Sequence, residues 1–459
     1  MAKRTPEPTR PPRERAFMVG VEIFGEKNML TLEDSLAELT LLADTAGLDV
    51  VGELTQKLDR PNPETFIGSG KVEELKTLAE EMMAQVILFD SELSPRHQRE
   101  LEAVFGTKVR VLDRTALILD IFAQHANTAE GILQVELAQY EYYLPRLTRQ
   151  WTHLARQAGG GGGRSGGVGG VGLRGPGETQ LEVDRRQIRA KISHLKKELE
   201  KVRAHRERYR SRRRQSQTPT VAIVGYTNAG KSTLLNRLTR SDVLAANQLF
   251  ATLDPTTRKL ELPGGTQALL TDTVGFIQKL PTTLVAAFRA TLEEISAADL
   301  LLHVVDISHP NALAQFRSVQ QTLDSIGARH IPVVTALNKV DRLKDPGAAD
   351  PILEQYPTAV AISATKSLNI PQLLEKIHQE LYENFSPIQL WLPYSQGQLI
   401  SQFHEAGQVE RIEHGRGGVT IQGRIPGRLL AQFRTASDEN RRDTVETQTP
   451  EPEETLEDE

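Results

Sequence analysis

The densest chemical pattern in the sequence is a glycine-rich loop that ends in lysine and serine. It reads Gly225-Tyr226-Thr227-Asn228-Ala229-Gly230-Lys231-Ser232. The β-branched residues 220–224 precede it and helix-like sequence follows. In this strand–loop–helix setting, the glycines let backbone N–H groups turn toward phosphates, and the helix N-terminus adds positive potential. Lys231 would meet the β- and γ-phosphates and the Ser232 hydroxyl would ligate Mg²⁺, so the pattern predicts a nucleoside-triphosphate site.

A second motif follows about 40 residues later, directly after the apolar residues 268–271. It reads Asp272-Thr273-Val274-Gly275. It matches a D-x-x-G switch, in which Asp272 holds the metal through a water molecule and the Gly275 N–H meets the γ-phosphate. The tetrapeptide alone is a weak signal, but its position after the first motif makes it specific.

Selectivity for guanine is predicted from Asn338-Lys339-Val340-Asp341, which follows residues 331–337. The Asp341 carboxylate can accept hydrogen bonds from N1–H and from the 2-amino group of guanine, whereas adenine offers neither donor there. A buried carboxylate left unpaired costs about 1–3 kcal/mol, which would disfavour ATP. Residues 358–362 lead into Ser363-Ala364-Thr365, whose backbone N–H groups would contact guanine O6. Four motifs in this order, each after a predicted strand, are what an open α/β nucleotide site requires.

A GTPase of this kind also needs a threonine that joins the metal only when the γ-phosphate is present. The sequence offers three within Phe250-Ala251-Thr252-Leu253-Asp254-Pro255-Thr256-Thr257. We favour Thr252, because this stretch resembles the first switch of bacterial GTPases related to Obg; Thr256 and then Thr257 are the alternatives. Residues 250–254 are expected to contact the nucleotide, and Ser232, Thr252 and Asp272 are expected to form the Mg²⁺ site.

Catalysis is expected to rest on Lys231, Thr252 and Gly275. The residue after the D-x-x-G motif is Phe276, where many GTPases place a glutamine that orients the attacking water. A phenyl ring cannot hydrogen-bond to water in this way, so another group or a partner must position the nucleophile. Asn228, the fourth residue of the loop, suggests that K⁺ near the β- and γ-phosphates supplies part of the positive charge.

These motifs must be positioned by an α/β fold. Residues 218–385 alternate strands and helices and are expected to form a Ras-like P-loop G domain. Residues 17–128 alternate in the same way and predict an N-terminal α/β domain with a mainly parallel sheet. Residues 386–436 predict a small C-terminal α+β domain, in which we recognise no catalytic or ligand-binding motif. The Pro-rich residues 1–16 and the acidic residues 437–459 are expected to be disordered tails.

Residues 129–217 are expected to form an antiparallel helical hairpin with a Gly-rich tip. Apolar residues recur at spacings of three and four in residues 133–151 and again in 181–202, which predicts two helices with matching seams. Pro145 should kink the first helix. The glycine-dominated residues 159–177 between them cannot form a packed core. This loop is either a flexible linker or a mobile tip that two stiff helices carry into a narrow RNA-lined site.

The net charge of −5 hides a strong asymmetry along the chain. Residues 437–459 carry ten acidic and two basic side chains, whereas residues 185–214 carry fourteen Lys or Arg and three Glu. A basic segment in an acidic protein suggests an anionic partner, RNA first, because a merely solvated helix face would have balanced charges. The sequence has no cysteine and no apolar run of membrane length. The Pro-rich, charged residues 1–15 contain no apolar h-region, so they are not expected to be a secretory leader. A cytoplasmic protein without disulfides or membrane insertion is therefore expected.

Three features together resemble the HflX family of translational GTPases. They are the nucleotide motifs, the Gly68-Ser69-Gly70-Lys71 segment after residues 62–65, and the R-G-P-G-E-T-Q-L-E stretch at residues 174–182. The resemblance covers about residues 17–436. It implies a monomer that binds GTP and GDP, associates with the 50S ribosomal subunit and its rRNA, and hydrolyses GTP when ribosomes stimulate it. It also implies splitting of stalled or idle 70S ribosomes, with the Gly-rich loop approaching the peptidyl transferase centre.

Other functions compete with this interpretation. Some members of the family bind or hydrolyse ATP through the N-terminal domain, but Gly68-Ser69-Gly70-Lys71 lacks full P-loop spacing, so a turn that caps a helix is preferred there. A GTP-gated RNA-binding protein with incidental turnover is the main alternative, and Phe276 keeps it open. A role in regulating a membrane protease is suggested by the family name alone. Neither the residues nor the resemblance decides between ribosome splitting, subunit assembly and rescue under stress.

Overall fold

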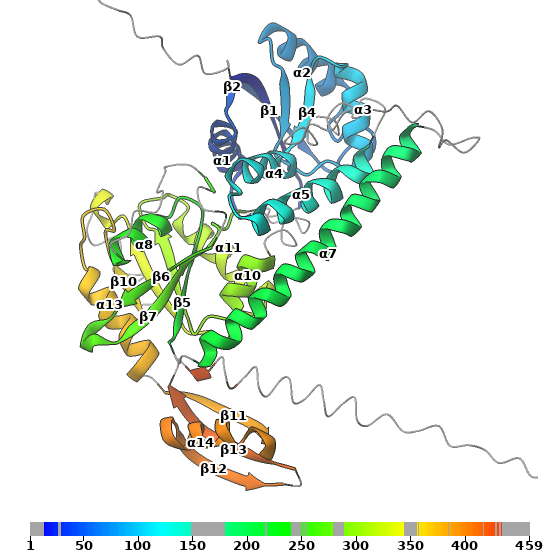
Figure 1. The fold of residues 1–459 in the computed structure, drawn as a ribbon. Coiled ribbons are helices and arrows are strands. Elements are labelled where there is room, and N and C mark those ends of the chain that lie inside the picture. The colour runs from blue at the N-terminus through cyan, green and yellow to red at the C-terminus, as the bar shows by residue number, and fades with distance from the viewer. Residues whose placement is uncertain are drawn as a thin grey trace, which may run out of the picture. The chain divides into compact units, whose positions relative to one another are not determined.

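The fold is that of a computed structural model, which places the chain in two compact units (Figure 1). The described residues are 13–25, 29–147, 180–215, 218–239, 249–250, 253, 255–278, 289–343, 356, 358–383, 385–415, 417–426, 429–430 and 433. The first unit contains residues 1–207, 246–254 and 277–289, and the second contains 208–245, 255–276 and 290–459. The predicted Gly-rich loop at 159–177 and the acidic tail at 437–459 lie outside the described residues.

The first unit is built on a four-stranded parallel sheet with the strand order β2-β1-β3-β4. The strands are β1 (Glu14–Ile23), β2 (Leu48–Leu58), β3 (Val86–Phe89) and β4 (Arg110–Asp113). All four residues of β3 are apolar and buried, as expected for a strand covered on both faces. The α/β class predicted from the sequence is confirmed by this sheet and by the one in the second unit.

Helices alternate with these strands. They are α1 (Leu32–Thr45), α2 (Ser69–Glu81), α3 (Pro95–Phe105), α4 (Arg114–His125) and α5 (Ala129–Tyr143). Side-chain caps set several of the starts: the Thr31 hydroxyl accepts the Asp34 N–H before α1, and Asp113 accepts the Ala116 N–H before α4. Gly68 is the N-cap of α2, so the predicted Gly-Ser-Gly-Lys segment forms the first turn of that helix.

The longest helix is α7 (Gln180–Gln215), with 36 residues. Before it in the chain, α5 ends at Tyr143 and a 3₁₀ turn, η1 (Leu144–Arg146), contains Pro145. Proline lacks the N–H that would continue the helix, so the predicted interruption occurs here. Among the described helices, α7 included, none is both long and apolar enough to cross a membrane.

Two ion pairs join α5 to α7. Lys191 lies 3.1 Å from Glu136, and Lys196 lies 2.8 Å from Glu141. The residue numbers rise together in the two pairs, so α5 and α7 run in the same direction where they meet. An antiparallel partner for α7, as predicted for the hairpin, would have to come from residues 148–179, which lie outside the described residues.

The second unit contains a six-stranded sheet with the order β10-β9-β8-β5-β7-β6. Only the edge pair of β6 with β7 is antiparallel in this sheet. Its strands are β5 (Thr220–Gly225), β6 (Thr256–Glu261), β7 (Gln267–Asp272), β8 (Leu300–Asp306), β9 (Val333–Asn338) and β10 (Ala359–Ala361). Its helices are α8 (Lys231–Thr239), α10 (Arg289–Ser296), α11 (Ala312–Ser325) and α13 (Ile370–His378), with short turns η3 (Pro263–Gly265), η4 (Val340–Arg342) and the π-helical η6 (Gln379–Glu383). Parallel strands joined by helices bring the carboxyl ends of β5, β7, β9 and β10, and hence the motifs, to one edge.

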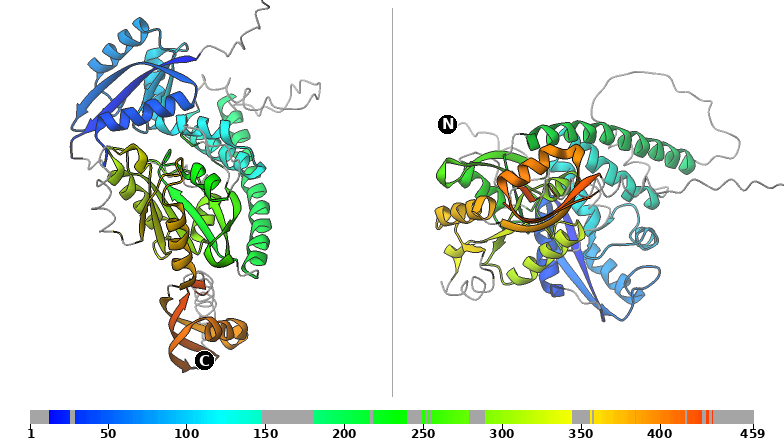
Figure 2. Two further views of the ribbon diagram at one scale, coloured as in Figure 1. Left: turned by 90° about the vertical axis from the view of Figure 1, so that its left-hand side faces the viewer. Right: turned by 90° about the horizontal axis from the view of Figure 1, so that it is seen from below.

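The C-terminal part of the second unit is a three-stranded antiparallel sheet with the order β11-β13-β12. It contains β11 (Phe385–Pro393), the turn η7 (Tyr394–Gln396), α14 (Gly397–Ala406), β12 (Gln408–His414) and β13 (Gly418–Pro426). Helix α14 lies along the sheet and contacts all three strands (Figure 2). Its core is apolar, with Leu392, Phe403 and Ile421 fully buried.

Candidate functional site

The glycine-rich loop connects the central strand β5 to α8. Gly225 has a φ of 153° and Gly230 a φ of 98°, both in the region that favours glycine. A Cβ atom on Gly225 would lie 2.3 Å from the Val304 carbonyl oxygen, and one on Gly230 would lie 2.4 Å from Asn338 Nδ2. Both glycines of the motif are therefore required by the backbone path and by close neighbours.

Lys231 begins α8, and its side chain curls over the loop. Its Nζ donates hydrogen bonds to the carbonyl oxygens of Gly225 (3.2 Å) and Tyr226 (2.9 Å). Burial lowers the pKa of Lys231 to about 8, and the nearby Asp272 carboxylate opposes that shift. A buried cation at a helix N-terminus is suited to bind phosphate oxygens, because few water molecules compete with them there.

Two side chains with oxygen atoms that could ligate a metal lie together at the predicted metal position. The Ser232 hydroxyl donates to Asp272 Oδ2 at 2.7 Å, and Asp272 is fully buried at the end of β7. A hydroxyl and a carboxylate are hard oxygen ligands, which fit Mg²⁺. Within the described residues, no three His, Cys, Asp or Glu side chains cluster as a metal site.

The threonines predicted for the first switch are only partly described. Ala251, Thr252 and Asp254 lie outside the described residues, so the structure does not bear on the choice of Thr252. Thr256 and Thr257 open β6, where Thr256 pairs with Asp272 across the ladder. The Thr257 hydroxyl lies 3.0 Å from that of Thr271.

The D-x-x-G segment lies directly against the loop. The Phe276 N–H donates to the Gly225 carbonyl (3.0 Å), and the Thr227 N–H donates to the Phe276 carbonyl (2.8 Å). A Cβ atom on Gly275 would lie 2.8 Å from Thr227 Cγ2 and 3.0 Å from Lys231 Nζ. Phe276 is 4% exposed, and its ring offers no hydrogen-bonding group for a water molecule.

Asn338 ties the base-recognition loops to the phosphate loop. Its Nδ2 donates to the Ala229 carbonyl at 2.9 Å, and its Oδ1 accepts the Ala364 N–H at 3.0 Å. The Ser363 hydroxyl in turn accepts the Lys366 N–H at 3.1 Å and lies 3.2 Å from the Thr365 hydroxyl. One side chain thus joins three of the four predicted motifs.

Lys339, Val340 and Asp341 follow Asn338 at the same edge of the sheet. Lys339 adopts a φ of 67°, and its Nζ donates to the Asn228 carbonyl at 2.8 Å and pairs with Asp306 at 2.7 Å. Val340 and Asp341 follow in the η4 turn, and the Asp341 side chain is exposed. Asp341 therefore stands beside the ordered loops with its carboxylate accessible to a ligand.

Comparisons with known proteins identify the family. Matches cover residues 33–123 with "GTP-binding GTPase N-terminal", 125–213 with "GTP-binding GTPase Middle Region" and 220–339 with "50S ribosome-binding GTPase". The GTPase HflX of Escherichia coli (strain K12) is 43% identical over 416 residues, covering 90% of this chain and 94% of that protein. The chain belongs to the HflX family of GTPases. A second HflX GTPase, from Caldanaerobacter subterraneus subsp. tengcongensis, is 42% identical over 426 residues, covering 92% of this chain and 93% of that protein.

Family membership and the P-loop fold together make this HflX-family chain a GTP-binding protein and a GTP hydrolase. Among solved structures, a GTP-binding protein from Sulfolobus solfataricus in complex with GDP is 25% identical, with a TM-score of 0.42 over 80% of this chain and 98% of that one. The family matches and the two HflX GTPases confirm, at the level of the family, the resemblance stated from the sequence motifs.

Sequence reasoning missed two supporting residues of this HflX-family site. Arg237, in the last turn of α8, donates to the carbonyl oxygens of Ala364 (3.2 Å) and Thr365 (3.1 Å) and so holds the loop expected to contact guanine O6. Asp306, at the end of β8, fixes Lys339. A charged residue at a strand's carboxyl end was a signal for Asp306, but Arg237 looked like an ordinary helix-terminal cation.

Proposed function

We propose that this GTPase acts as a monomer in the cytosol on the large ribosomal subunit. In this account the GTP-bound protein binds the 50S subunit and its rRNA and separates stalled or idle 70S ribosomes, and hydrolysis then releases it. The observation that carries the proposal is α7, a 36-residue helix with a large excess of basic residues that ends five residues before β5 begins. The match of residues 220–339 to "50S ribosome-binding GTPase" also supports it.

The basic helix supplies the affinity in this proposal. Its lysines are exposed even where they form ion pairs: the Lys196 side chain is 59% exposed and that of Lys201 is 72% exposed. Exposed ion pairs of this kind contribute little to stability. The lysines can therefore leave their carboxylate partners and pair with RNA phosphates. Neutralising backbone phosphates releases counterions whatever the RNA sequence, which makes such binding strong and salt-dependent.

Within the site, we assign roles to the chain's own groups. The backbone N–H groups of residues 225–232 surround the phosphates, and Lys231 carries the positive charge toward the β- and γ-phosphates. The Gly275 N–H meets the γ-phosphate, and Thr252 completes the GTP-bound arrangement. Asp341 reads the guanine edge, with residues 250–254 and 363–365 completing the nucleotide contacts.

Ser232, Asp272 and Thr252 would hold Mg²⁺, Asp272 through a water molecule. When bound, the ion would neutralise developing charge on the phosphate oxygens. K⁺ beside Asn228 is the second cation that we propose, because its charge would occupy the region where other GTPases use an arginine. Phe276 excludes water from its own position rather than orienting it, so the ribosome is expected to supply or order the group that positions the nucleophile.

Co-sedimentation with isolated subunits tests the proposal. The full chain should pellet with 50S subunits in a non-hydrolysable GTP analogue, and less so in GDP. Replacing Lys196, Lys197, Lys201 and Arg203 with glutamine should weaken the pelleting and flatten its dependence on salt. Equal recovery in all nucleotide states, or a preference for the small subunit, would refute it.

Deletion of residues 160–172 tests the proposed role of the Gly-rich loop. Intrinsic GTP hydrolysis should persist, because these residues are separate from the nucleotide motifs, and much of the subunit binding should remain. Splitting of 70S ribosomes, followed by light scattering, should fall. Normal splitting at normal affinity would show that the loop is a passive linker, for which shortening changes only a small loop-closure entropy.

The alternative function is a GTP-gated RNA-binding protein in which turnover is incidental. Phe276 favours it, because the usual water-orienting residue is missing from its position. The rate of GTP hydrolysis distinguishes the two functions. An enzyme of this type is stimulated by its ribosomal partner, whereas a gated binder hydrolyses GTP equally with and without it.

A further inference from the structure

Thr227, the third residue of the phosphate-binding loop, carries a buried hydroxyl that lacks a partner. The residue is 7% exposed, and in the part of the chain that the structure describes its Oγ1 atom is buried without a hydrogen bond. A hydroxyl can donate one hydrogen bond and accept two, so its burial without any is unfavourable. An unsatisfied buried group of this kind needs an explanation, and a role in catalysis is one of the few available.

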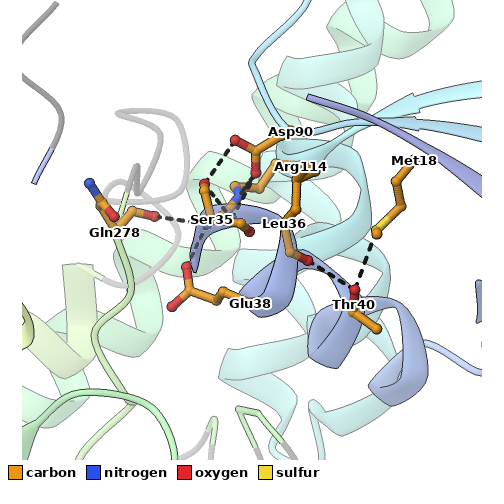
Figure 3. Close-up of polar contacts among 8 residues, drawn as sticks. All are labelled: Met18, Ser35, Leu36, Glu38, Thr40, Asp90, Arg114 and Gln278. Atoms are coloured by element: carbon orange, nitrogen blue, oxygen red, sulfur yellow. Dashed lines mark hydrogen bonds and ion pairs between the residues drawn. The ribbon is translucent and has the colours of Figure 1, made fainter. Parts of the chain in front are cut away.

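Other buried hydroxyls of this protein are satisfied. In the cluster around Arg114 in the first unit, Ser35 is 4% exposed and its hydroxyl donates to Asp90 Oδ2 at 2.8 Å (Figure 3). In the D-x-x-G motif, the Thr273 hydroxyl donates to a backbone carbonyl at 2.6 Å. Thr227 departs from this pattern inside the nucleotide site.

The Thr227 side chain packs against the end of the D-x-x-G segment. The Thr227 N–H donates to the Phe276 carbonyl at 2.8 Å. A Cβ atom on Gly275 would lie 2.8 Å from Thr227 Cγ2 and 2.9 Å from Thr227 Cα, so the Gly275 backbone lies directly beside this side chain. All three residues belong to the second unit. Because Oγ1 and Cγ2 share one Cβ atom, the hydroxyl lies close to the same contact.

This contact is where other GTPases orient the attacking water. Many of them use a glutamine directly after the D-x-x-G motif. Here that residue is Phe276, which is 4% exposed and whose ring offers no hydrogen-bonding group. The site therefore lacks the usual water-orienting side chain and holds an unpartnered hydroxyl against the same segment.

We propose that the Thr227 hydroxyl is a catalytic group that accepts a hydrogen bond from the attacking water and so orients it toward the γ-phosphate. The water oxygen forms a bond to the γ-phosphorus while the bond from that phosphorus to the β–γ bridging oxygen breaks. The electron pair of the broken bond stays on GDP, and both water protons remain on the released phosphate.

The proposal rests on the γ-phosphate roles that are proposed above for Lys231 and Gly275, and it deepens the proposed hydrolysis. A hydroxyl rotates freely and has a single donor, whereas the amide of a glutamine is planar and has two. Thr227 therefore holds the water less firmly than a glutamine would, which leaves room for stimulation by a partner.

Thr227→Val tests this role, because valine has nearly the shape of threonine and lacks the hydroxyl. Single-turnover hydrolysis of GTP by the full chain, without ribosomes, should slow by about 10- to 100-fold, since misplacing a reacting group by about 1 Å costs up to about 100-fold. Affinities for GDP and for a non-hydrolysable GTP analogue should stay at their wild-type values. The melting temperature should not fall, because the substitution removes a hydroxyl that has no partner. Thr227→Ser keeps the hydroxyl and should keep most of the rate.

Thr335→Val is the matched control. Thr335 is 3% exposed in β9 of the same sheet and lies outside the nucleotide motifs, so this variant should hydrolyse GTP at the wild-type rate. A wild-type rate in Thr227→Val would overturn the proposal, as would an equal loss in Thr227→Ser. A loss explained entirely by weaker binding of the GTP analogue would overturn it too, because the hydroxyl would then bind the γ-phosphate and not the water. No ribosome enters this assay, so a failure of 50S subunits to stimulate the wild type would count against the proposed function alone.

Discussion

Replacing Asn338 with alanine tests whether one side chain holds the nucleotide loops together. Asn338 is 2% exposed and makes two hydrogen bonds to backbone groups, one to the Ala229 carbonyl and one from the Ala364 N–H. Truncation leaves both groups buried without these partners, at about 1–3 kcal/mol each, or about 2–6 kcal/mol together. Because 1.4 kcal/mol is tenfold in an equilibrium constant, we expect at least about tenfold weaker nucleotide binding.

Isothermal titration with GDP and with a non-hydrolysable GTP analogue measures this loss. The two nucleotides should weaken to a similar extent, since the loops concerned carry the base contacts that both share. Asn369→Ala is the matched control: that asparagine also donates to a backbone carbonyl, Ala361 at 2.8 Å, but it is exposed and water can replace the bond. Unchanged affinity in a folded Asn338→Ala protein, or loss of one nucleotide alone, would refute the reasoning.

The roles assigned to the remaining site residues can each be tested. Asp341→Asn should weaken GTP binding and shift preference toward xanthosine nucleotides, whose 2-oxo group suits an amide donor; unchanged GTP affinity would contradict the assignment. Burial lowers the pKa of Lys231 to about 8, and bound phosphate favours the protonated ammonium. GDP affinity should therefore be constant below that pKa and fall as the pH rises above it. A GDP affinity that stays flat between about pH 6.5 and 9 would be inconsistent with a phosphate-bound Lys231. Ser232→Ala should abolish the Mg²⁺-dependent part of GTP affinity. Thr252→Ala should spare GDP binding but impair the GTP-bound state. If Thr256→Ala has this effect and Thr252→Ala does not, the choice of Thr252 is wrong. GTP turnover should be faster in KCl than in NaCl at matched ionic strength, and equal rates would remove K⁺ from the account.

The parts of the site that the sequence predicted are those fixed by local backbone needs. Gly225 and Gly230 are recognisable because a turn of this shape admits no side chain at either position. Both belong to one short, continuous motif, so the sequence alone shows the requirement. Arg237 was not recognisable, because its partners, the carbonyls of Ala364 and Thr365, lie far along the chain. A cation at a helix end is common, so its type and position carry no signal of this contact.

The fold, like the site, was predictable where local sequence patterns determine it and not where contacts between distant residues do. Alternating apolar segments predicted α/β architecture, because periodicity reports which residues are buried. Periodicity does not report direction: residues 133–143 are helical, but the buried apolar residues there are Val135, Ala138 and Tyr142, and α5 runs alongside α7 in the same sense. Arg114 shows the same limit, since nothing in a sequence distinguishes an arginine 2% exposed from one on a surface.

The most direct test of the central claim is the rate of GTP hydrolysis as purified 50S subunits are added. In the proposed mechanism Phe276 leaves the nucleophile poorly positioned, and the large subunit corrects this. Turnover should therefore rise with 50S concentration and saturate, and it should not respond to 30S subunits alone. A rate that stays at its intrinsic value at every 50S concentration, with binding shown in the same solution, would contradict the account and leave a GTP-gated RNA-binding protein.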